Sequence, residues 1–245
     1  MLKVEKLSKS YSKGLIALED ISFTIKPQTF TAILGSSGAG KTTLLRCILQ
    51  LLKPDGGQVW FQGQDLTTCS AKDLGKVRAQ IATIAQQFNL VRRRSALDNC
   101  LGGRLQELPL WRCLFGCFPD SLQQEGMAAL ERVQLLNVAF QRADSLSGGQ
   151  QQRVAIARAL TQRASLILAD EPIASLDPET AHTVLNLMRS LCIQEGVTVI
   201  CNLHQVEMAK QYSDRILGIQ GGRLVLDMPT NQLSDSDVNK IYYKS

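Results

Sequence analysis

The chain opens with short segments that are either apolar throughout or alternate between apolar and polar residues. They extend from Leu2 to Leu7, from Ile21 to Ile25 and from Phe30 to Leu34, and turn-forming residues separate them. Segments of this length and pattern are typical of β-strands. We therefore expect residues 1–34 to be rich in β-structure.

The middle of the chain has a different pattern. A helical periodicity from Lys41 to Leu52 stops at Pro54-Asp55-Gly56-Gly57, and Gln58 to Gln62 then resembles a further strand. Helical patterns dominate residues 90–160, where Gly102-Gly103 and the stretch PLWRCLFGCFP at 109–119 interrupt them. This block predicts a separate helical unit.

Strands and helices alternate in the last third of the chain. The helix expected there has Asp177 placed to cap it and Pro178 at its first position. The expected elements are the strands Leu166 to Ala169 and Val197 to Leu203, the helix Pro178 to Glu195 between them, a hairpin around Gly221-Gly222, and a terminal helix from Gln232 to Tyr243. The alternation predicts an α/β fold with a mostly parallel sheet covered on both faces. Residues 90–160 would then be a helical subdomain inserted into a core formed by 1–89 and 161–245.

The composition is that of an ordinary globular protein. Of the 245 residues, 44% are apolar and 20% are charged, which allows a sizeable core and excludes global disorder. The apolar runs are strand-sized and fall short of the roughly 18 residues that cross a bilayer. The opening MLKVEKLSKSY lacks the apolar centre of a signal peptide. We expect a chain that does not enter a membrane by itself.

Charge and cysteine content argue against a nucleic-acid partner and against a cysteine–histidine metal site. The net charge of +5 is small and spread along the chain, apart from the run Arg92-Arg93-Arg94. The chain has seven cysteines, none in a C-x-x-C pair, and two histidines. This supply of ligands does not favour a metal centre. Cys113 and Cys117 are spaced to share a helix face, and we expect two buried thiols in a reducing, cytosolic environment.

A glycine-rich segment predicts a nucleotide site. Gly35 to Thr42, GSSGAGKT, fits G-x-x-x-x-G-K-[ST] and lies between an expected strand and an expected helix. Its glycines let backbone N–H groups curl around a phosphate, Lys41 supplies a mobile charge, and the Thr42 hydroxyl can bind Mg²⁺. The predicted phosphate loop consists of Gly35, Ser36, Ser37, Gly38, Ala39, Gly40, Lys41, Thr42 and Thr43.

Two adjacent carboxylates end the apolar strand near residue 166. Strand alternation directs Asp170 and Glu171 to different sides. Asp170 can face the Mg²⁺ side of the phosphate loop, and Glu171 can reach a water in line with the γ-phosphate. Together with the phosphate loop, this pair indicates hydrolysis of the nucleotide rather than its storage.

The segment Leu146-Ser147-Gly148-Gly149-Gln150 predicts a second anion site. Ser147 is placed as the N-cap of a helix from Gln150 to Gln162, with two glycines in the first turn. The exposed N–H groups and the Ser147 hydroxyl can bind a phosphate, although no lysine accompanies them. Two phosphate-binding helix ends in one chain make sense if each nucleotide is held from two directions.

The combination of these motifs resembles the ATP-binding cassette ATPases, over nearly the whole chain. The resemblance implies a P-loop, RecA-like sheet core with an antiparallel β subdomain and an inserted helical subdomain. It also implies ATP and Mg²⁺ as cofactors, with Ser147, Gly148, Gly149 and Gln150 contacting ATP. Two copies would pack head to tail, with each ATP between the phosphate loop of one copy and the Ser147 segment of the other.

The same resemblance assigns roles to four further residues. Tyr11, 30 residues before Lys41, resembles the aromatic residue that stacks on adenine. Asp177, in Ser175-Leu176-Asp177, is similar to a loop at the dimer interface. His204 resembles the switch histidine that contacts the γ-phosphate. Gln86, in IAQQF, resembles the glutamine that binds Mg²⁺ and senses the attacking water.

One position departs from the common pattern of these ATPases. Ala85 stands where many relatives have Phe, which leaves Gln87 as the alternative to Gln86. The resemblance implies that Lys41, Ser147 and His204 stabilise charge while Glu171 polarises the water or accepts its proton.

Several stretches resemble the ATP-binding subunits of phosphonate importers in particular, the most specific being the aromatic insertion at 109–119. This implies a peripheral protein at the cytoplasmic face of the inner membrane, working with two membrane-spanning permease subunits and, through them, a substrate-binding protein. The alternatives are an importer of another small nutrient, such as a polar amino acid, and a soluble ATPase without a transport role. The insertion itself either packs in the helical subdomain's core or contacts the permease, where Arg92 to Arg94 would also dock.

Overall fold

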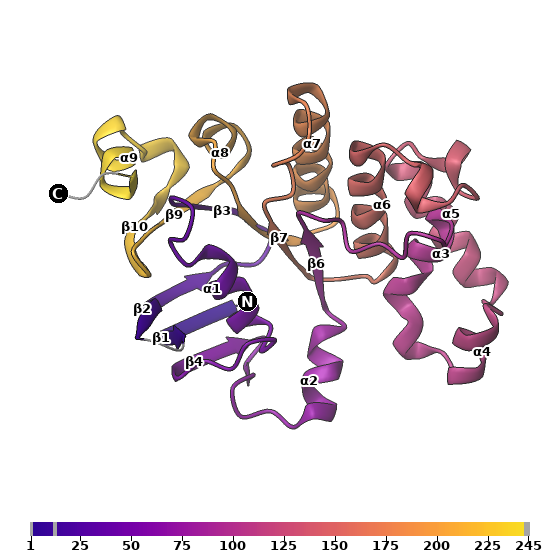
Figure 1. The fold of residues 1–245 in the computed structure, drawn as a ribbon, viewed down its shortest axis with the longest axis horizontal. Helices are drawn as coiled ribbons and strands as arrows, with labels where there is room; N and C mark the ends of the chain where they lie inside the picture. Colours follow the sequence, from indigo (N-terminus) through magenta and orange to yellow (C-terminus); the bar gives the residue numbers. More distant parts are fainter. Residues whose placement is uncertain (1, 12–13, 243–245) are drawn as a thin grey trace.

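The computed structural model describes residues 2–11 and 14–242, which form two sheets and a set of surrounding helices (Figure 1). The smaller sheet is antiparallel, with strand order β2-β1-β4-β5. Its strands are β1 (Leu2–Tyr11), β2 (Leu15–Ile25), β4 (Gly56–Phe61) and β5 (Gln64–Asp65). The β-rich opening that the sequence predicted is therefore present, and its third strand belongs to the other sheet.

The larger sheet has the order β10-β9-β3-β8-β7-β6, and its neighbours are parallel except for the β9–β10 hairpin. Its strands are β3 (Phe30–Leu34), β6 (Ile81–Ala85), β7 (Leu166–Asp170), β8 (Thr198–Asn202), β9 (Arg215–Gln220) and β10 (Arg223–Pro229). The expected α/β fold with a mostly parallel sheet is confirmed, and the hairpin turns at Gly221-Gly222 as predicted.

Strand alternation divides the core between the two faces of this sheet. Phe30, Ala32 and Leu34 of β3 join the cluster that packs on the helices between β6 and β7, whereas Ile33 joins the cluster around the antiparallel sheet. Because successive side chains point to opposite faces, a strand buried on both sides must be apolar throughout. All five residues of β3 are buried, as this requires.

Helices cover both faces of the larger sheet and fill one end of the molecule (Figure 1). Those that follow strands are α1 (Lys41–Ile48), α2 (Ala71–Arg78), α7 (Pro178–Gln194), α8 (Val206–Tyr212) and α9 (Asp235–Tyr242). Those inserted between β6 and β7 are α3 (Ala96–Leu101), α4 (Leu110–Phe115), α5 (Asp120–Arg132) and α6 (Gly148–Thr161), with the 3-10 turns η1 (Gly102–Glu107), η2 (Leu136–Val138) and η3 (Ala143–Ser145). A last turn, η4 (Thr230–Gln232), precedes α9. The predicted end of the terminal helix, Tyr243, lies outside the described residues.

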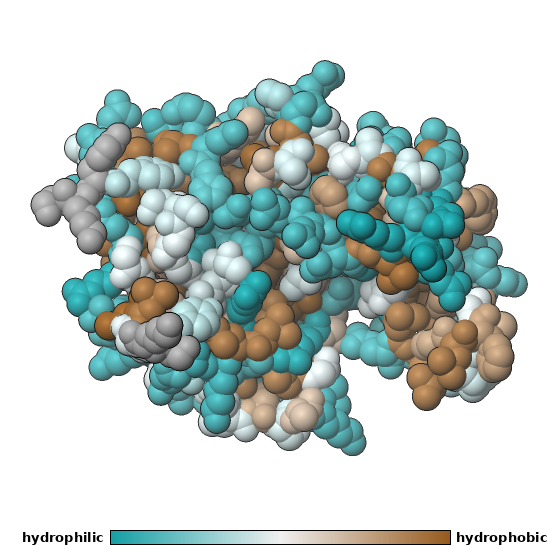
Figure 2. Space-filling model, in the orientation of Figure 1, coloured by the Kyte–Doolittle hydropathy of each residue, from teal (hydrophilic) through white to brown (hydrophobic). Residues whose placement is uncertain are grey.

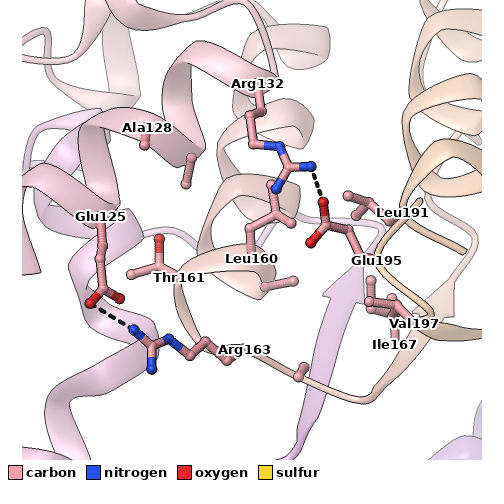
Figure 3. A pocket seen from close by; sticks show the side chains of 13 residues that line it. Glu125, Ala128, Arg132, Leu160, Thr161, Arg163, Ile167, Leu191, Glu195 and Val197 are labelled. Atoms are coloured by element: carbon pink, nitrogen blue, oxygen red, sulfur yellow. Dashed lines mark hydrogen bonds and ion pairs between the residues drawn. The ribbon is translucent and has the colours of Figure 1, made fainter.

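A cavity of about 380 Å³ lies where the inserted helices meet the sheet core. Figure 3 shows two ion pairs at its rim, between Arg132 and Glu195 and between Arg163 and Glu125. The first of them joins the end of α5 to the residue that follows α7. The inserted helices are therefore tied to the core by charge as well as by apolar contact.

The two cysteines of the insertion are not placed as the sequence predicted. Helix α4 ends at Phe115, and Gly116 follows it in the left-handed conformation with φ = 67°. The chain reverses there, so Cys113 and Cys117 do not share a helix face. Cys117 is exposed and Cys113 is only half-buried, so the expectation of two buried thiols is wrong.

The insertion does not pack as core either. Leu110, Trp111, Leu114 and Phe115 are exposed, and of the aromatic residues in this stretch only Phe118 packs against the main apolar cluster. Of the two alternatives for the insertion, core packing is therefore wrong for most of its residues, since α4 lies at the outer edge of the helical block (Figure 1).

Candidate functional site: the carboxyl edge of the parallel strands

Most of the residues predicted to bind nucleotide or act in its hydrolysis lie where the parallel strands of the larger sheet end. The phosphate loop follows β3, His204 follows β8, Asp170 and Glu171 close β7, and Gln86 follows β6. These four strands are consecutive neighbours in the order β3-β8-β7-β6. Parallel strands present their carboxyl ends at one edge, so the topology gathers residues from distant parts of the chain.

Glycines are required where the phosphate loop passes close to other backbone. A Cβ at Gly35 would lie 2.4 Å from the carbonyl oxygen of Ile219, and a Cβ at Gly40 would lie 2.4 Å from that of Ala17. Gly40 also has φ = 107°, a left-handed conformation that favours glycine, and it stands as the N-cap of α1. The loop can thus turn sharply and present the N–H groups at the start of α1.

Lys41 is held inside the loop. Its ammonium donates to the carbonyl oxygens of Gly35 at 2.8 Å and of Ser36 at 3.0 Å, and the side chain is buried. Burial lowers the pKa of Lys41, while the carboxylates of Glu171 and Asp170 act in the opposite direction. The lysine is therefore positioned by backbone oxygens that a phosphate oxygen can replace as its partner.

Asp170 is fixed by two donors at the same carboxylate oxygen. Its Oδ1 accepts from the Thr42 hydroxyl at 3.0 Å and from Nδ2 of Asn202 at 2.7 Å. Asp170 and Asn202 are direct register partners at the ends of β7 and β8, and Asn202 is fully buried. The carboxylate is thus held facing the first turn of α1.

This arrangement fits Mg²⁺. The Asp170 carboxylate and the Thr42 hydroxyl are oxygen ligands, which Mg²⁺ prefers, and they lie next to the loop that would hold the phosphates. Within residues 2–11 and 14–242, no group of three His, Cys, Asp or Glu side chains is close enough to bind a metal alone. Phosphate oxygens and waters would complete the coordination, as is usual for Mg²⁺.

Glu171 and His204 form a pair beside this site. His204 Nε2 lies 2.6 Å from Glu171 Oε1, although the two residues are 33 positions apart in sequence. Glu171 has φ = 52°, an uncommon conformation for a non-glycine residue, and it turns the chain sharply after β7. Both side chains are partly exposed, so a water molecule can reach the carboxylate.

The remaining predicted residues occupy three separate places. Tyr11, at the end of β1, has its hydroxyl 3.2 Å from Thr43 Oγ1. Gln86 and Gln87 are both exposed in the turn after β6, and neither side chain has a hydrogen-bond partner among the described residues. Ser147 caps α6 in a reciprocal capping box with Gln150, and Asp177 caps α7 by accepting from the Thr180 N–H.

The starts of α6 and α7 lie side by side. A Cβ at Gly149 would come within 2.2 Å of Thr180 Cγ2, and one at Gly148 would lie 3.6 Å from both Leu176 and Phe88. The Ser147 hydroxyl is exposed, and its hydrogen bonds are local to α6. The start of α6 therefore lies beside the start of α7 and beside Phe88, two residues after Gln86.

Sequence reasoning missed two residues that contact this site. Asn202 holds Asp170, and its Oδ1 has no hydrogen-bond partner among the described residues. Tyr242 of α9 donates to the carbonyl oxygen of His204 at 3.1 Å, and burial raises the pKa of its hydroxyl. A polar residue inside the apolar run 197–203 could have indicated Asn202, whereas no local pattern indicates Tyr242.

Comparison with curated proteins gives near full-length relatives. The chain is 46% identical over 242 residues to "Phosphonates import ATP-binding protein PhnC 2" of Rhodopseudomonas palustris, covering 99% of this chain and 89% of that protein. It is 44% identical over 241 residues to "Phosphonates import ATP-binding protein PhnC" of Staphylococcus aureus, covering 98% and 94% respectively.

Comparisons with solved structures and with protein families agree with the similarity to ATP-binding import proteins. The cassette MJ0796, solved as a dimer in a post-hydrolysis state bound to ADP and Pi, superposes with a TM-score of 0.83 at 30% identity, covering 95% of this chain and all of that one. The model of the "ABC transporter" family matches residues 18–174. Because this match spans more than half of the chain, the chain belongs to the ABC transporter family, as its nucleotide-binding motifs predicted.

Proposed function

We propose that this chain is the ATP-hydrolysing subunit of an importer that takes up a phosphonate, a phosphite or a phosphate ester. The observation that carries the hydrolytic part is the meeting of the phosphate loop, the Thr42–Asp170 pair and the Glu171–His204 pair at one sheet edge. The substrate class rests on the near full-length similarity to phosphonate import proteins.

Glu171 is the residue that activates water in this proposal. The reaction is attack of water on the γ-phosphate, which forms ADP and inorganic phosphate. Glu171 accepts or orients the proton of the water, and His204 Nε2, 2.6 Å away, holds the carboxylate in place and faces the departing phosphate. Lys41 and the N-terminus of α1 bind the phosphate oxygens and stabilise the charge that develops on them.

Mg²⁺ would be held by the Thr42 hydroxyl and the Asp170 carboxylate, with Gln86 approaching from the turn after β6. When bound, it neutralises charge on the phosphates. Asn202 keeps the Asp170 carboxylate turned toward this position through its 2.7 Å hydrogen bond.

A head-to-tail dimer would complete the site. Within one chain Gly148 at the start of α6 lies beside Leu176 and Phe88, and the exposed Ser147 with the adjacent N–H groups would bind the γ-phosphate held by a second copy. Tyr11, beside Thr43, would stack on the adenine. We also propose that residues 90–160 act as a helical subdomain that carries the Ser147 end toward the partner.

Two membrane-spanning permease subunits and a substrate-binding protein would supply the pathway and the selection of substrate. No helix among residues 2–11 and 14–242 is both long and apolar enough to cross a bilayer. The chain would thus bind peripherally at the cytoplasmic face, and the exposed run Arg92 to Arg94 beside the helical block is a docking candidate. Replacing all three arginines should weaken assembly with the permease, and unchanged assembly would contradict that assignment.

The decisive experiment is affinity capture of Glu171→Gln from native membranes with ATP and Mg²⁺. Recovery of a multi-span membrane protein would support the importer. Its substrate-binding protein would then be tested by calorimetry with phosphonate, phosphite, phosphate and a polar amino acid. Binding only of the amino acid would reassign the substrate, and recovery of soluble partners alone would overturn the transport proposal while leaving the ATPase chemistry in place.

A further inference from the structure

The tip of the β9–β10 hairpin contacts both the phosphate loop and β2. Its two-residue turn consists of Gly221 and Gly222, with φ values of 54° and 80°. Positive φ at both positions is typical of a type I′ hairpin turn, for which Asn-Gly and Gly-Gly are preferred sequences. Gly221 is exposed, whereas Gly222 is buried. The two glycines therefore have similar backbone conformations but different surroundings.

Both backbone polar groups of Gly222 are bound by other elements. Its N–H donates to the Ala39 carbonyl oxygen at 3.0 Å, and its own carbonyl oxygen accepts from the Glu19 N–H at 2.8 Å. Glu19 belongs to β2, and its carboxylate also accepts two hydrogen bonds from the Arg223 guanidinium, at 2.9 and 2.5 Å. The hairpin tip is thus fixed on β2 at the point where it binds the phosphate loop.

The junction has no room for a side chain at Gly222. A Cβ there would lie 2.8 Å from the Ala17 carbonyl oxygen, which a Cβ at Gly40 would approach to 2.4 Å. The Ala17 carbonyl group therefore packs between the hairpin tip and the phosphate loop. Figure 2 shows side chains filling the region between β2 and β10, and the recess on this face lies elsewhere, between α2 and α4.

The hydrogen bond from Gly222 acts on the peptide group between Ala39 and Gly40. In a trans peptide the carbonyl and the N–H point in opposite directions. Because the Ala39 carbonyl is held toward the hairpin, the Gly40 N–H points away from it. In the proposed function, this N–H is one of the donors around the start of α1 that bind phosphate.

We infer that Gly222 is a positioning residue for phosphate binding, which sets the direction of the Gly40 N–H through its hydrogen bond to Ala39. Donors that are already oriented need no rearrangement when the ligand binds, so the affinity depends on the contacts that hold them. The inference rests on the proposed nucleotide site and extends it to the β9–β10 hairpin, which lies outside the phosphate-loop motif.

A matched pair of substitutions tests the inference. Asparagine tolerates positive φ, so Gly221→Asn keeps the turn and places its side chain in open space. Gly222→Asn also tolerates the turn, but its Cβ forces the hairpin tip away from Ala17 and the phosphate loop. Titration with fluorescent N-methylanthraniloyl-ADP should show a Kd raised at least about tenfold for Gly222→Asn, as for loss of one hydrogen bond to a charged group. The Kd of Gly221→Asn should equal that of the parent chain.

The conditions separate lost positioning from lost stability. Binding is measured where circular dichroism shows that nearly all molecules are folded, because a variant that is only less stable then binds ADP with the parental Kd. If Gly222→Asn does not fold, Arg223→Gln takes its place. Loss of the exposed ion pair with Glu19 should raise the Kd about twofold. Lys76→Gln, which breaks the exposed pair with Asp73 on α2, is its control and should leave the Kd unchanged.

The possible results separate this inference from the nucleotide site itself. An unchanged Kd for Gly222→Asn, or for Arg223→Gln where the first variant does not fold, overturns the inference and leaves the nucleotide site standing. Equal losses for Gly221→Asn and Gly222→Asn also overturn it, since the turn and not the contact with Ala39 would be responsible. Failure of the parent chain to bind ADP would overturn the nucleotide site and the inference together.

Discussion

The nucleotide edge of the sheet and helix α4 use their side chains in opposite ways. At the edge, charged and polar groups are partly or fully buried and are held by short hydrogen bonds, as between Asp170 and Asn202 at 2.7 Å. At α4, large apolar groups such as Phe115 are exposed and do not pack in the core. Each region reverses the usual preference for burying apolar and exposing polar groups.

The difference shows which groups in each region lack favourable partners in the folded chain, and which kind of ligand would supply them. Buried polar groups need partners, and a ligand with phosphates and a cation would provide partners at the edge. Exposed apolar groups gain free energy only when another apolar surface covers them. The edge therefore depends on exact hydrogen-bond geometry, whereas α4 depends on what it meets outside the protein. The following substitutions test this contrast.

The largest effect is expected from Glu171→Gln. If Glu171 accepts the proton as proposed, the substitution should lower ATP turnover about 10²- to 10⁴-fold while nucleotide binding is retained, and should trap the closed dimer. Phosphate release, nucleotide binding and sedimentation of the ATP-bound form would measure this. Glu179→Gln, an exposed carboxylate in the first turn of α7, is the control. Near-normal hydrolysis by Glu171→Gln would contradict the assignment.

A pair of leucines compares the two environments by stability. Leu130 of α5 is fully buried and Leu114 of α4 is 69% exposed. Leu130→Ala should lower the free energy of unfolding by about 2–5 kcal/mol, whereas Leu114→Ala should change it by less than about 0.5 kcal/mol. Urea denaturation followed by circular dichroism measures both. A comparable loss for Leu114→Ala would mean that α4 is part of the core.

Asn202→Leu tests whether the buried amide positions Asp170. Loss of the Nδ2 donor should raise the Mg²⁺ concentration needed for half-maximal nucleotide binding by roughly tenfold, which corresponds to the lower end of the about 1.5–3 kcal/mol that a hydrogen bond to a charged group contributes. Mn²⁺ titration followed by electron paramagnetic resonance gives a readout independent of turnover. Thr31→Val, which alters a fully buried hydroxyl in β3, is the matched control and should leave the metal requirement unchanged.

The smallest effect is expected from Tyr242→Phe. It removes one hydrogen bond to the His204 carbonyl, worth about 0.5–1.5 kcal/mol, so turnover should fall only about threefold. Tyr212→Phe, which removes the 2.8 Å contact with His182, should leave turnover unaffected. Equal behaviour of the two variants would show that α9 does not position His204.

Much of the nucleotide edge was predictable because its signals are local. Glycines are needed in the phosphate loop because the backbone passes close to other backbone there and takes a left-handed φ. The apolar segments before the loop and before Asp170 have the length and pattern of strands. The helix caps at Ser147 and Asp177 were equally predictable from the sequence, since each cap involves residues within one turn.

Other features depend on residues that are distant in sequence. The register between β7 and β8 puts Asn202 opposite Asp170, and chain reversal at a positive φ brings Glu171 to His204, 33 residues away. Local periodicity carries no information about strand order or register, so it could not predict these contacts. Helix α1 also ends at Ile48 rather than near Leu52, because Gln50 takes a left-handed φ of 54°.

By itself, the sequence determined the phosphate loop, the paired carboxylates and the alternation that builds a parallel sheet. Each is fixed by interactions between near neighbours along the chain. Only the tertiary structure decided that α4 turns Leu110, Trp111, Leu114 and Phe115 outward, against the expectation from their hydrophobicity. The reason is physical: hydrophobicity states what a side chain gains by leaving water, and only packing decides whether the folded chain provides that burial.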